Sequence, residues 1–386
     1  RDLVRSRGLG DVYKRQHPQS GRLAHLLILH TRKSNVFPSC RTRLERVRAL
    51  LNAAVLAATM IGSIGCAGRD SLQRFEFTRV CMGVQARLLV FGENSEEVTK
   101  SAESTFRLLA TLDACMSDYR VDSELNRLSD SAGGPPVSVS DDLFRVLESG
   151  LAYSAASGGA FDPTTGTAVR LWRDSRRTHR LPDDSELSAA RSRIGRHSIS
   201  LTHGTRSVRI ATPGTRLDLG GIAKGYAAQR AVEHLRAKGF PQSLVSLAGD
   251  ISAGRPPPGA TGWKVALGSC DTGRSAPMIW LADASVSTSG ACEQFIEIDG
   301  VRFAHIVDPR TGLGSTNRGI VTVIAPDGAA ADALSTAAFL LGPEQTSRML
   351  AEFPDVAAIF APEQGARFEV IGDSRQVRWV SEGLSR

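Results

Sequence analysis

The stretch Leu217–Gly225 reads LDLGGIAKG and is typical of a strand end that passes through a glycine turn into a helix. Glycine lets the main chain turn sharply and approach a ligand closely, and the first N–H groups of a helix lack partners within it. With Lys224 beside them, these groups predict a site for a phosphorylated ligand. The glycine order fits neither GxGxxG nor GxxxxGK[ST], so a plain strand-to-helix connection remains an equal alternative from these residues alone.

Hydrophobic periodicity around this stretch predicts a mixture of strands and helices. Strands are expected at 85–91, 198–202, 207–211, 263–268, 357–360 and 368–371. Helices are expected at 98–116, after a cap at Asn94 or Ser95, and at 143–151, 222–238, 328–341 and 343–352. Asp299-Gly300 predicts a hairpin between 294–298 and 301–307. The expected architecture is α+β, as one domain over residues 75–386, with a division into two lobes left open.

Six further landmarks accompany the opening stretch in a fixed order along the chain. They are Met82-Gly83, Met116–Arg120, Gly159–Pro163, Ala248–Ile251, His305–Gly312 and Ala331–Thr336. Together they resemble the ApbE family of FAD:protein FMN transferases, and the resemblance covers most of the chain after Cys66. It implies the family's mixed α/β fold and a reaction in which FMN is moved from FAD to a hydroxyl of another protein.

The basic residues of the chain are concentrated near its beginning. The chain has 47 Lys and Arg against 40 Asp and Glu, a net charge of +7, but residues 1–50 hold 12 of the basic and 3 of the acidic ones. The rest therefore carries 35 basic against 37 acidic residues. Because binding to nucleic acid needs a basic face on the folded domain, this distribution argues against a nucleic-acid partner.

The first 66 residues are expected to lie outside the catalytic domain. Residues 1–40 lack an initiating Met and resemble translated flanking sequence. Residues 41–66 are typical of a secretory signal, with arginines before an apolar run at 49–64 that is shorter than the about 20 residues of a membrane span. Gly65-Cys66 resembles a lipoprotein cleavage site, although Ser63 departs from it, and an ordinary buried cysteine is the alternative. We therefore expect a lipid anchor at Cys66, on the periplasmic side of the bacterial inner membrane.

Four cysteines follow the expected anchor: Cys81, Cys115, Cys270 and Cys292. No CxxC pair and no histidine at zinc-finger spacing accompanies them, so a zinc site is not expected. Disulfides can form in an exported protein, but a chain of this length can bury a core without them. Free buried cysteines are predicted.

Asp332 and Thr336 are four residues apart in a predicted helix and therefore project from one face. Carboxylate and hydroxyl oxygens suit Mg²⁺, which keeps few protein ligands and completes its shell with water and phosphate oxygens. From the residues alone, the simpler interpretation is that Asp332 caps or solvates the helix and Thr336 bonds back to a carbonyl. The resemblance implies instead that both bind the metal, together with the main-chain carbonyl of Gly221.

The resemblance also implies contacts to FAD. Lys224 would offset phosphate charge and Asp218 would hold a hydroxyl or a ring donor, although a strand-end ion pair of these two is the alternative. Tyr119 would offer an aromatic face to the isoalloxazine, unless it fills the core. The remaining expected contacts are Met82 in the first strand, the turn Ala160-Phe161-Asp162, Asp250 and the pair His305-Ile306. Family members more often have Gly-Gly where this chain has Ala248-Gly249, which weakens the expectation for Asp250.

His305 and Asp332 are the expected catalytic residues. Imidazole titrates near neutral pH, so His305 is the candidate proton acceptor, and a cofactor contact is its alternative role. The expected reaction is Mg²⁺-dependent transfer of FMN from FAD to a Thr or Ser hydroxyl of an exported acceptor protein, with release of AMP. Two alternatives are hydrolysis of FAD at the same site and a lipid-anchored flavin-binding protein without turnover. The metal pair favours an enzyme, because a pure binder needs no metal against the diphosphate.

Overall fold

The computed structural model describes residues 72–268, 270, 276–292, 294–361 and 368–380 of the 386-residue chain. The expected leader, the signal segment and Cys66 lie outside these residues. Within the described ranges, no helix is both long and apolar enough to cross a membrane.

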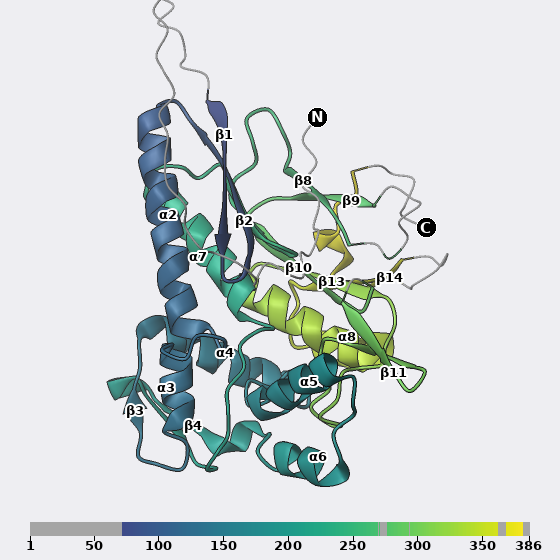
Figure 1. The fold of residues 1–386 in the computed structure, drawn as a ribbon. Helices are drawn as coiled ribbons and strands as arrows, with labels where there is room; N and C mark the ends of the chain where they lie inside the picture. The colour runs from purple at the N-terminus through teal and green to yellow at the C-terminus, as the bar shows by residue number, and fades with distance from the viewer. Residues whose placement is uncertain (1–71, 269, 271–275, 293, 362–367, 381–386) are drawn as a thin grey trace, which may run out of the picture. The chain divides into compact units, whose positions relative to one another are not determined.

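An antiparallel sheet of eight strands carries the fold (Figure 1). The strands, in spatial order, are β1 (Gln73–Cys81), β2 (Val84–Gly92), β6 (Ser243–Leu247), β7 (Asp250–Ala253), β10 (Ala284–Gly290), β13 (Ile320–Ala325), β14 (Ala357–Ala361) and β15 (Glu369–Gly372). All residues of β6 and β13 are buried. Because both faces of these strands are covered, their residues do not alternate between apolar and polar as in a half-buried strand, which explains why the sequence did not indicate these two as strands.

Three helices cover one face of this sheet: α2 (Ser95–Met116), α7 (Ala223–Ala237) and α8 (Gly328–Leu350). The side chain of Asn94 caps α2 by accepting the N–H groups of Glu96 and Glu97, as predicted. The label α8 spans two helices that meet at a kink at Gly342, where φ +74° and ψ 176° are not helical, so the two predicted helices 328–341 and 343–352 are confirmed. Pro343 directly follows the kink. Because proline has no backbone N–H, it cannot donate a hydrogen bond to the preceding turn, and the helix is interrupted there.

The opposite face of the sheet packs against a hairpin of β8 (Trp263–Ala266) and β9 (Met278–Leu281). Cys270 and Cys292 form a disulfide with a Cα–Cα distance of 5.4 Å, so the prediction of free cysteines was wrong for this pair. The fold brings the segment after β8 to the segment after β10, and no local spacing in the sequence signals that approach. Cys81 and Cys115 are free, and burial raises the pKa of Cys115 to about 12.

The remaining elements surround the lower part of the helical layer in Figure 1. They are α3 (Glu124–Asp130), β3 (Val137–Ser138), α4 (Asp141–Ala156), α5 (Gly166–Thr178), α6 (Asp184–Arg191), β4 (Ile199–Thr202), β5 (Ser207–Ile210), β11 (Phe295–Ile298) and β12 (Val301–Ala304), with short 3₁₀ turns at Arg196–Ser198, His203–Thr205 and Ser374–Gln376. Asp299 and Gly300 both have positive φ between β11 and β12, which confirms the predicted hairpin. The predictions missed α3, α5 and α6, and α5 later proves central to the site.

Candidate active site

The glycine corner Gly220-Gly221 leads into α7, as predicted, but the segment before it is not a strand. Residues 215–219 pair with no strand of a sheet. Instead, Asp218 donates its N–H to the carbonyl of Pro163 at 2.9 Å, and Gly166 donates to Arg216 at 3.0 Å. The segment is held against the turn at 163–166, so the prediction of a strand was wrong while the prediction of a turn into a helix was right.

α7 and α8 cross next to this corner at two glycines. A Cβ atom placed on Gly225 would lie 2.0 Å from the carbonyl oxygen of Gly328, and one on Gly328 would lie 2.2 Å from that of Gly225. Only glycine permits such an approach. As a result, the carboxylate of Asp332 on α8 reaches α7 and accepts the N–H of Gly225 at 3.0 Å.

The crossing also brings Thr336 to the corner. A Cβ atom on Gly221 would lie 2.9 Å from Thr336 Oγ1, so the hydroxyl and the main chain of Gly221 are neighbours. Gly221 and Thr336 are half-buried, whereas Asp332 is 3 % exposed. The three predicted metal-binding residues therefore lie close together. Asp332 is buried, whereas the simpler interpretation required it to cap the helix or face solvent.

Two carboxylates and one lysine share the charge behind the corner. Lys224 forms an ion pair with Asp250, and its Nζ lies 3.9 Å from Oδ2 of Asp332. Burial opposes the charge of Lys224, but the two carboxylates outweigh it and raise its pKa. Burial, together with the charge of Asp250, raises the pKa of Asp332. The single positive charge of Lys224 does not balance the two carboxylates of Asp250 and Asp332. The alternative ion pair between Lys224 and Asp218 is not formed, because Lys224 pairs with Asp250.

Hydroxyls that the sequence analysis missed complete this cluster. On β10, the hydroxyl of Ser287 donates to the carboxylate of Asp250 at 2.5 Å. The hydroxyl oxygen of Ser289 lies 2.8 Å from that of Ser335 and 3.3 Å from that of Thr336. The signal was present, because serines at 285, 287 and 289 alternate along a strand. Within the described ranges, including this cluster, no group of three or more Cys, His, Asp or Glu side chains is placed to hold a metal ion.

A second cluster lies around Asp218. Arg173 of α5 forms an ion pair with Asp118 and lies 3.4 Å from Oδ2 of Asp218. Its Cζ is 4.1 Å from the ring centroid of Tyr119, which is a cation–π distance. Burial and the neighbouring Asp118 raise the pKa of Asp218. Tyr119 is 76 % exposed, so it does not fill the core and its ring is available to a ligand.

The turn Ala160-Phe161-Asp162 is buried behind the corner. Phe161 lies 3.3 Å from the position of a Cβ on Gly221, so it supports the corner from behind. The carboxylate of Asp162 accepts hydrogen bonds from Ser154, from Arg196 N–H and from the N–H and hydroxyl of Thr164. Since its oxygens are engaged within the protein, Asp162 anchors the turn, and the sequence offered no signal for that.

Two turn positions differ from what the sequence suggested. Met82 lies in the β1–β2 turn with φ +52°, so its placement within the first strand was wrong. Ala248 lies in the β6–β7 turn with φ +57°, a conformation that glycine adopts without cost. This explains the glycine seen more often there in the family. Asp250 follows that turn and still reaches Lys224.

His305 follows β12 and is held by the segment before β11. Its N–H donates to the carbonyl of Gln294 at 3.1 Å, and its Nδ1 lies 3.3 Å from the same oxygen. Burial lowers the pKa of His305 to about 4, and the charges of Arg176 and Lys224 act in the same direction. The ring is therefore neutral near pH 7. Ile306 packs against the main apolar core.

The chain resembles known proteins over most of its length. The ApbE family matches residues 82–360. The FAD:protein FMN transferase of Treponema pallidum is 35% identical over 333 residues, covering 79% of this chain and 89% of that protein, and the one of Klebsiella pneumoniae is 30% identical over 289 residues, covering 74% and 88%.

Solved structures give the same result for the fold. The flavin transferase ApbE from Vibrio cholerae superposes with a TM-score of 0.70 at 26% identity, covering 78% of this chain and 98% of that one. The ApbE protein from Thermotoga maritima has a TM-score of 0.69 at 27% identity, covering 79% and 98%. The predicted mixed α+β fold is confirmed, and this chain belongs to the ApbE family.

Proposed function

We propose that this protein is an FAD:protein FMN transferase that requires Mg²⁺. It moves FMN from FAD to a Thr or Ser hydroxyl of an exported acceptor protein and releases AMP. The observation that carries the proposal is the crossing of α7 and α8, which puts Asp332 and Thr336 beside the glycine corner at Gly221. The relatives from Treponema pallidum and Klebsiella pneumoniae bear the same enzyme name.

The donor set at the corner fits Mg²⁺. Asp332 and Thr336 would hold the ion with oxygen atoms, and the carbonyl of Gly221 is the third candidate ligand. Mg²⁺ commonly takes few protein oxygens and fills its shell with water and phosphate. The raised pKa of Asp332 supports this assignment, because it reflects a buried carboxylate whose charge Lys224 alone does not balance. When bound, the ion would withdraw charge from the diphosphate as the P–O bond breaks.

The side chains around FAD divide the remaining work. Lys224 would stabilise negative charge on the diphosphate, because its Nζ lies 3.9 Å from Oδ2 of Asp332, which is the proposed ligand of the ion bound to the diphosphate. Tyr119 would stack on the isoalloxazine, and Asp218 would hold a flavin hydroxyl or ring donor. Met82, Ala160, Phe161, Asp162, Asp250 and Ile306 complete the proposed cofactor contacts. Because Asp162 and Asp250 have protein partners for their carboxylates, their part is to shape the site.

His305 is proposed to accept the proton of the acceptor hydroxyl. A carbonyl oxygen only accepts, so Nδ1 must be the donor to Gln294, which leaves Nε2 with its lone pair. The hydroxyl oxygen would attack the phosphorus on the FMN side while its proton passes to Nε2. The bond from that phosphorus to the bridging oxygen breaks, and AMP leaves with the oxygen.

Mass spectrometry of the acceptor tests the reaction itself. Purified protein incubated with FAD, Mg²⁺ and a candidate acceptor should add one FMN to a Thr or Ser, and EDTA should prevent it. Release of AMP without any adduct on an acceptor that other transferases modify would identify hydrolysis of FAD, the second candidate function.

Replacing His305 with Gln should slow transfer by about 10²- to 10⁴-fold, the usual contribution of general base catalysis. In the unchanged protein at saturating Mg²⁺, which keeps Asp332 ionised against its raised pKa, the rate should stay level between neutral pH and about 5 and fall as the pH approaches about 4, where His305 gains a proton. Rates measured from pH 4 to 8 check both expectations. The exposed His197→Gln variant is the matched control. A raised KM for FAD with kcat unchanged would reduce His305 to a cofactor contact.

We also propose that the protein is exported and anchored by lipid at Cys66. The support is the basic, apolar and small-residue order of residues 41–66, which lie outside the described residues. Detection of a diacylglyceryl thioether on Cys66 in protein from a bacterial membrane fraction tests this; an unmodified Cys66 in that fraction contradicts it.

A further inference from the structure

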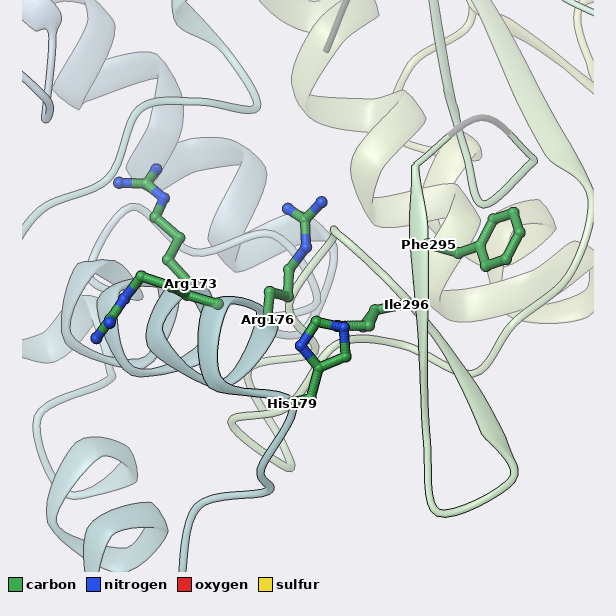
Figure 2. A pocket seen from close by; sticks show the side chains of 6 residues that line it. Arg173, Arg176, His179, Phe295 and Ile296 are labelled. Carbon is green, nitrogen blue, oxygen red and sulfur yellow. The ribbon is translucent and has the colours of Figure 1, made fainter. Parts of the chain in front are cut away.

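A basic pocket lies at the C-terminal end of α5. It has a volume of about 410 Å³ and is lined by Arg173, Arg176, Arg177, His179, Phe295 and Ile296. Figure 2 shows His179 extending from the end of α5 toward Ile296 on β11. Residues 170–180 contain five arginines, one histidine and one aspartate, in a protein whose residues after 50 are slightly acidic overall. Positive charge is therefore concentrated along α5 and at the end of this helix, next to the pocket.

Part of this charge has no counterpart in the protein. Within the described ranges, Arg176 and His179 form no ion pair or hydrogen bond through their side chains, whereas Arg177 pairs with Asp174 at 3.1 Å. Cations at the C-terminal end of a helix are stabilised a little by the helix dipole. That stabilisation does not require a second element facing the cations to form the other wall of a pocket. Here β11 supplies one, with Phe295 47 % exposed and the guanidinium of Arg302 3.6 Å from its ring centroid.

The pocket lies between the two ends of the proposed reaction site. Arg173 lines it and also lies on the ring of Tyr119, the proposed flavin platform. Phe295 lines the other side and directly follows Gln294, whose carbonyl holds His305. A molecule in the pocket would therefore have the flavin on one side and the proton acceptor on the other. The hydroxyl of the acceptor protein has to approach His305, and the pocket borders the segment that holds His305.

We propose that this pocket docks an acidic segment of the acceptor protein and so aligns the hydroxyl-bearing residue between Tyr119 and His305. The inference rests on the proposed function and adds the chemistry of the partner. Arginines and an exposed aromatic ring are the side chains enriched at protein interfaces, and they match carboxylates flanked by apolar groups. The diphosphate of FAD has its own place at Lys224 and the glycine corner.

Binding of a synthetic oligoglutamate peptide tests the proposal without any acceptor. Its Kd, measured by calorimetry at low ionic strength, should rise about tenfold for Arg176→Glu and about threefold for Arg176→Gln, since opposite charges across an interface are replaced by like charges or by none. Arg176→Lys should bind nearly as the unchanged protein does. Arg107→Glu is the matched control, because Arg107 is exposed on α2 and the change in charge is the same.

Three results would overturn the proposal. They are the absence of peptide binding, an equal loss in Arg107→Glu, and displacement of the peptide by AMP, which would make the pocket a nucleotide site. AMP release from FAD and Mg²⁺ by the unchanged protein is measured in parallel. If AMP is released but the peptide does not bind, the docking proposal fails and the enzymatic one stands; if the peptide binds but no AMP is released, the enzymatic proposal fails instead.

Discussion

Asp332→Ala should lower the rate of Mg²⁺-dependent AMP release from FAD by about a thousandfold, the scale on which loss of a key electrostatic group acts. Asp332 is the only carboxylate among the three proposed metal ligands, so its removal takes away the charge that holds the ion. FAD affinity should change much less, because Tyr119, Asp218 and Lys224 remain. The measurement is AMP formation against Mg²⁺ concentration, with FAD binding followed by flavin fluorescence. AMP release at the unchanged rate would refute the metal assignment.

Asp332→Asn separates loss of charge from damage to the fold. The amide oxygen can still accept the N–H of Gly225, so no buried donor is left without a partner. The folded state raises the pKa of Asp332 above its ordinary value, so ionisation of this carboxylate destabilises the protein once the pH exceeds that value. Without Mg²⁺, Asp332→Asn should therefore have a higher Tm than the unchanged protein at pH 7, and the difference should vanish at low pH. A lower Tm at pH 7 would contradict the electrostatic account.

Elements with one buried face could be predicted from the sequence. The stripe on 98–116 and its cap at Asn94 gave α2, and Asp299-Gly300 gave the hairpin, because helix caps and tight turns are encoded within a few residues. The spacing of Asp332 and Thr336 likewise put both on one helix face. Their meeting with Gly221 followed only from the family resemblance, since the approach depends on two glycines more than 100 residues apart.

Features that depend on distant segments could not be predicted in this way. Arg173 bridges Asp118 and Asp218 from α5, a helix with few buried apolar residues, and no local pattern indicated that these three side chains meet. The disulfide joins Cys270 after β8 to Cys292 after β10, and these two strands pair with other strands and not with each other. In both cases the tertiary arrangement, rather than local preference, brings the groups together, and a pattern of a few residues carries no information about it.

Gly225→Ala is expected to destabilise the protein even though it lies inside a helix. Helix propensity alone predicts a gain of about 1 kcal/mol for this change. The new Cβ, however, would lie 2.0 Å from the carbonyl oxygen of Gly328 and 2.7 Å from Cβ of Asp332, both on α8. Main-chain atoms cannot move aside as a flexible side chain does, so α7 and α8 must separate. We expect a net loss at the upper end of the about 1–3 kcal/mol typical of overpacked cores.

The separation should also remove activity, because Asp332 would move away from the N–H of Gly225 and from Gly221. Thermal unfolding and AMP release are measured on the same protein. Gly204→Ala is the matched control, since a Cβ there meets nothing within 4 Å, and it should leave Tm and rate nearly unchanged. Gly221→Ala should behave differently from both, with a higher Mg²⁺ requirement at a smaller cost in stability than Gly225→Ala, because the three atoms nearest to its Cβ belong to the side chains of Phe161 and Thr336 rather than to the main chain. A higher Tm for Gly225→Ala would mean that propensity outweighs the clash, and that the two helices do not cross as closely as the proposed metal site requires.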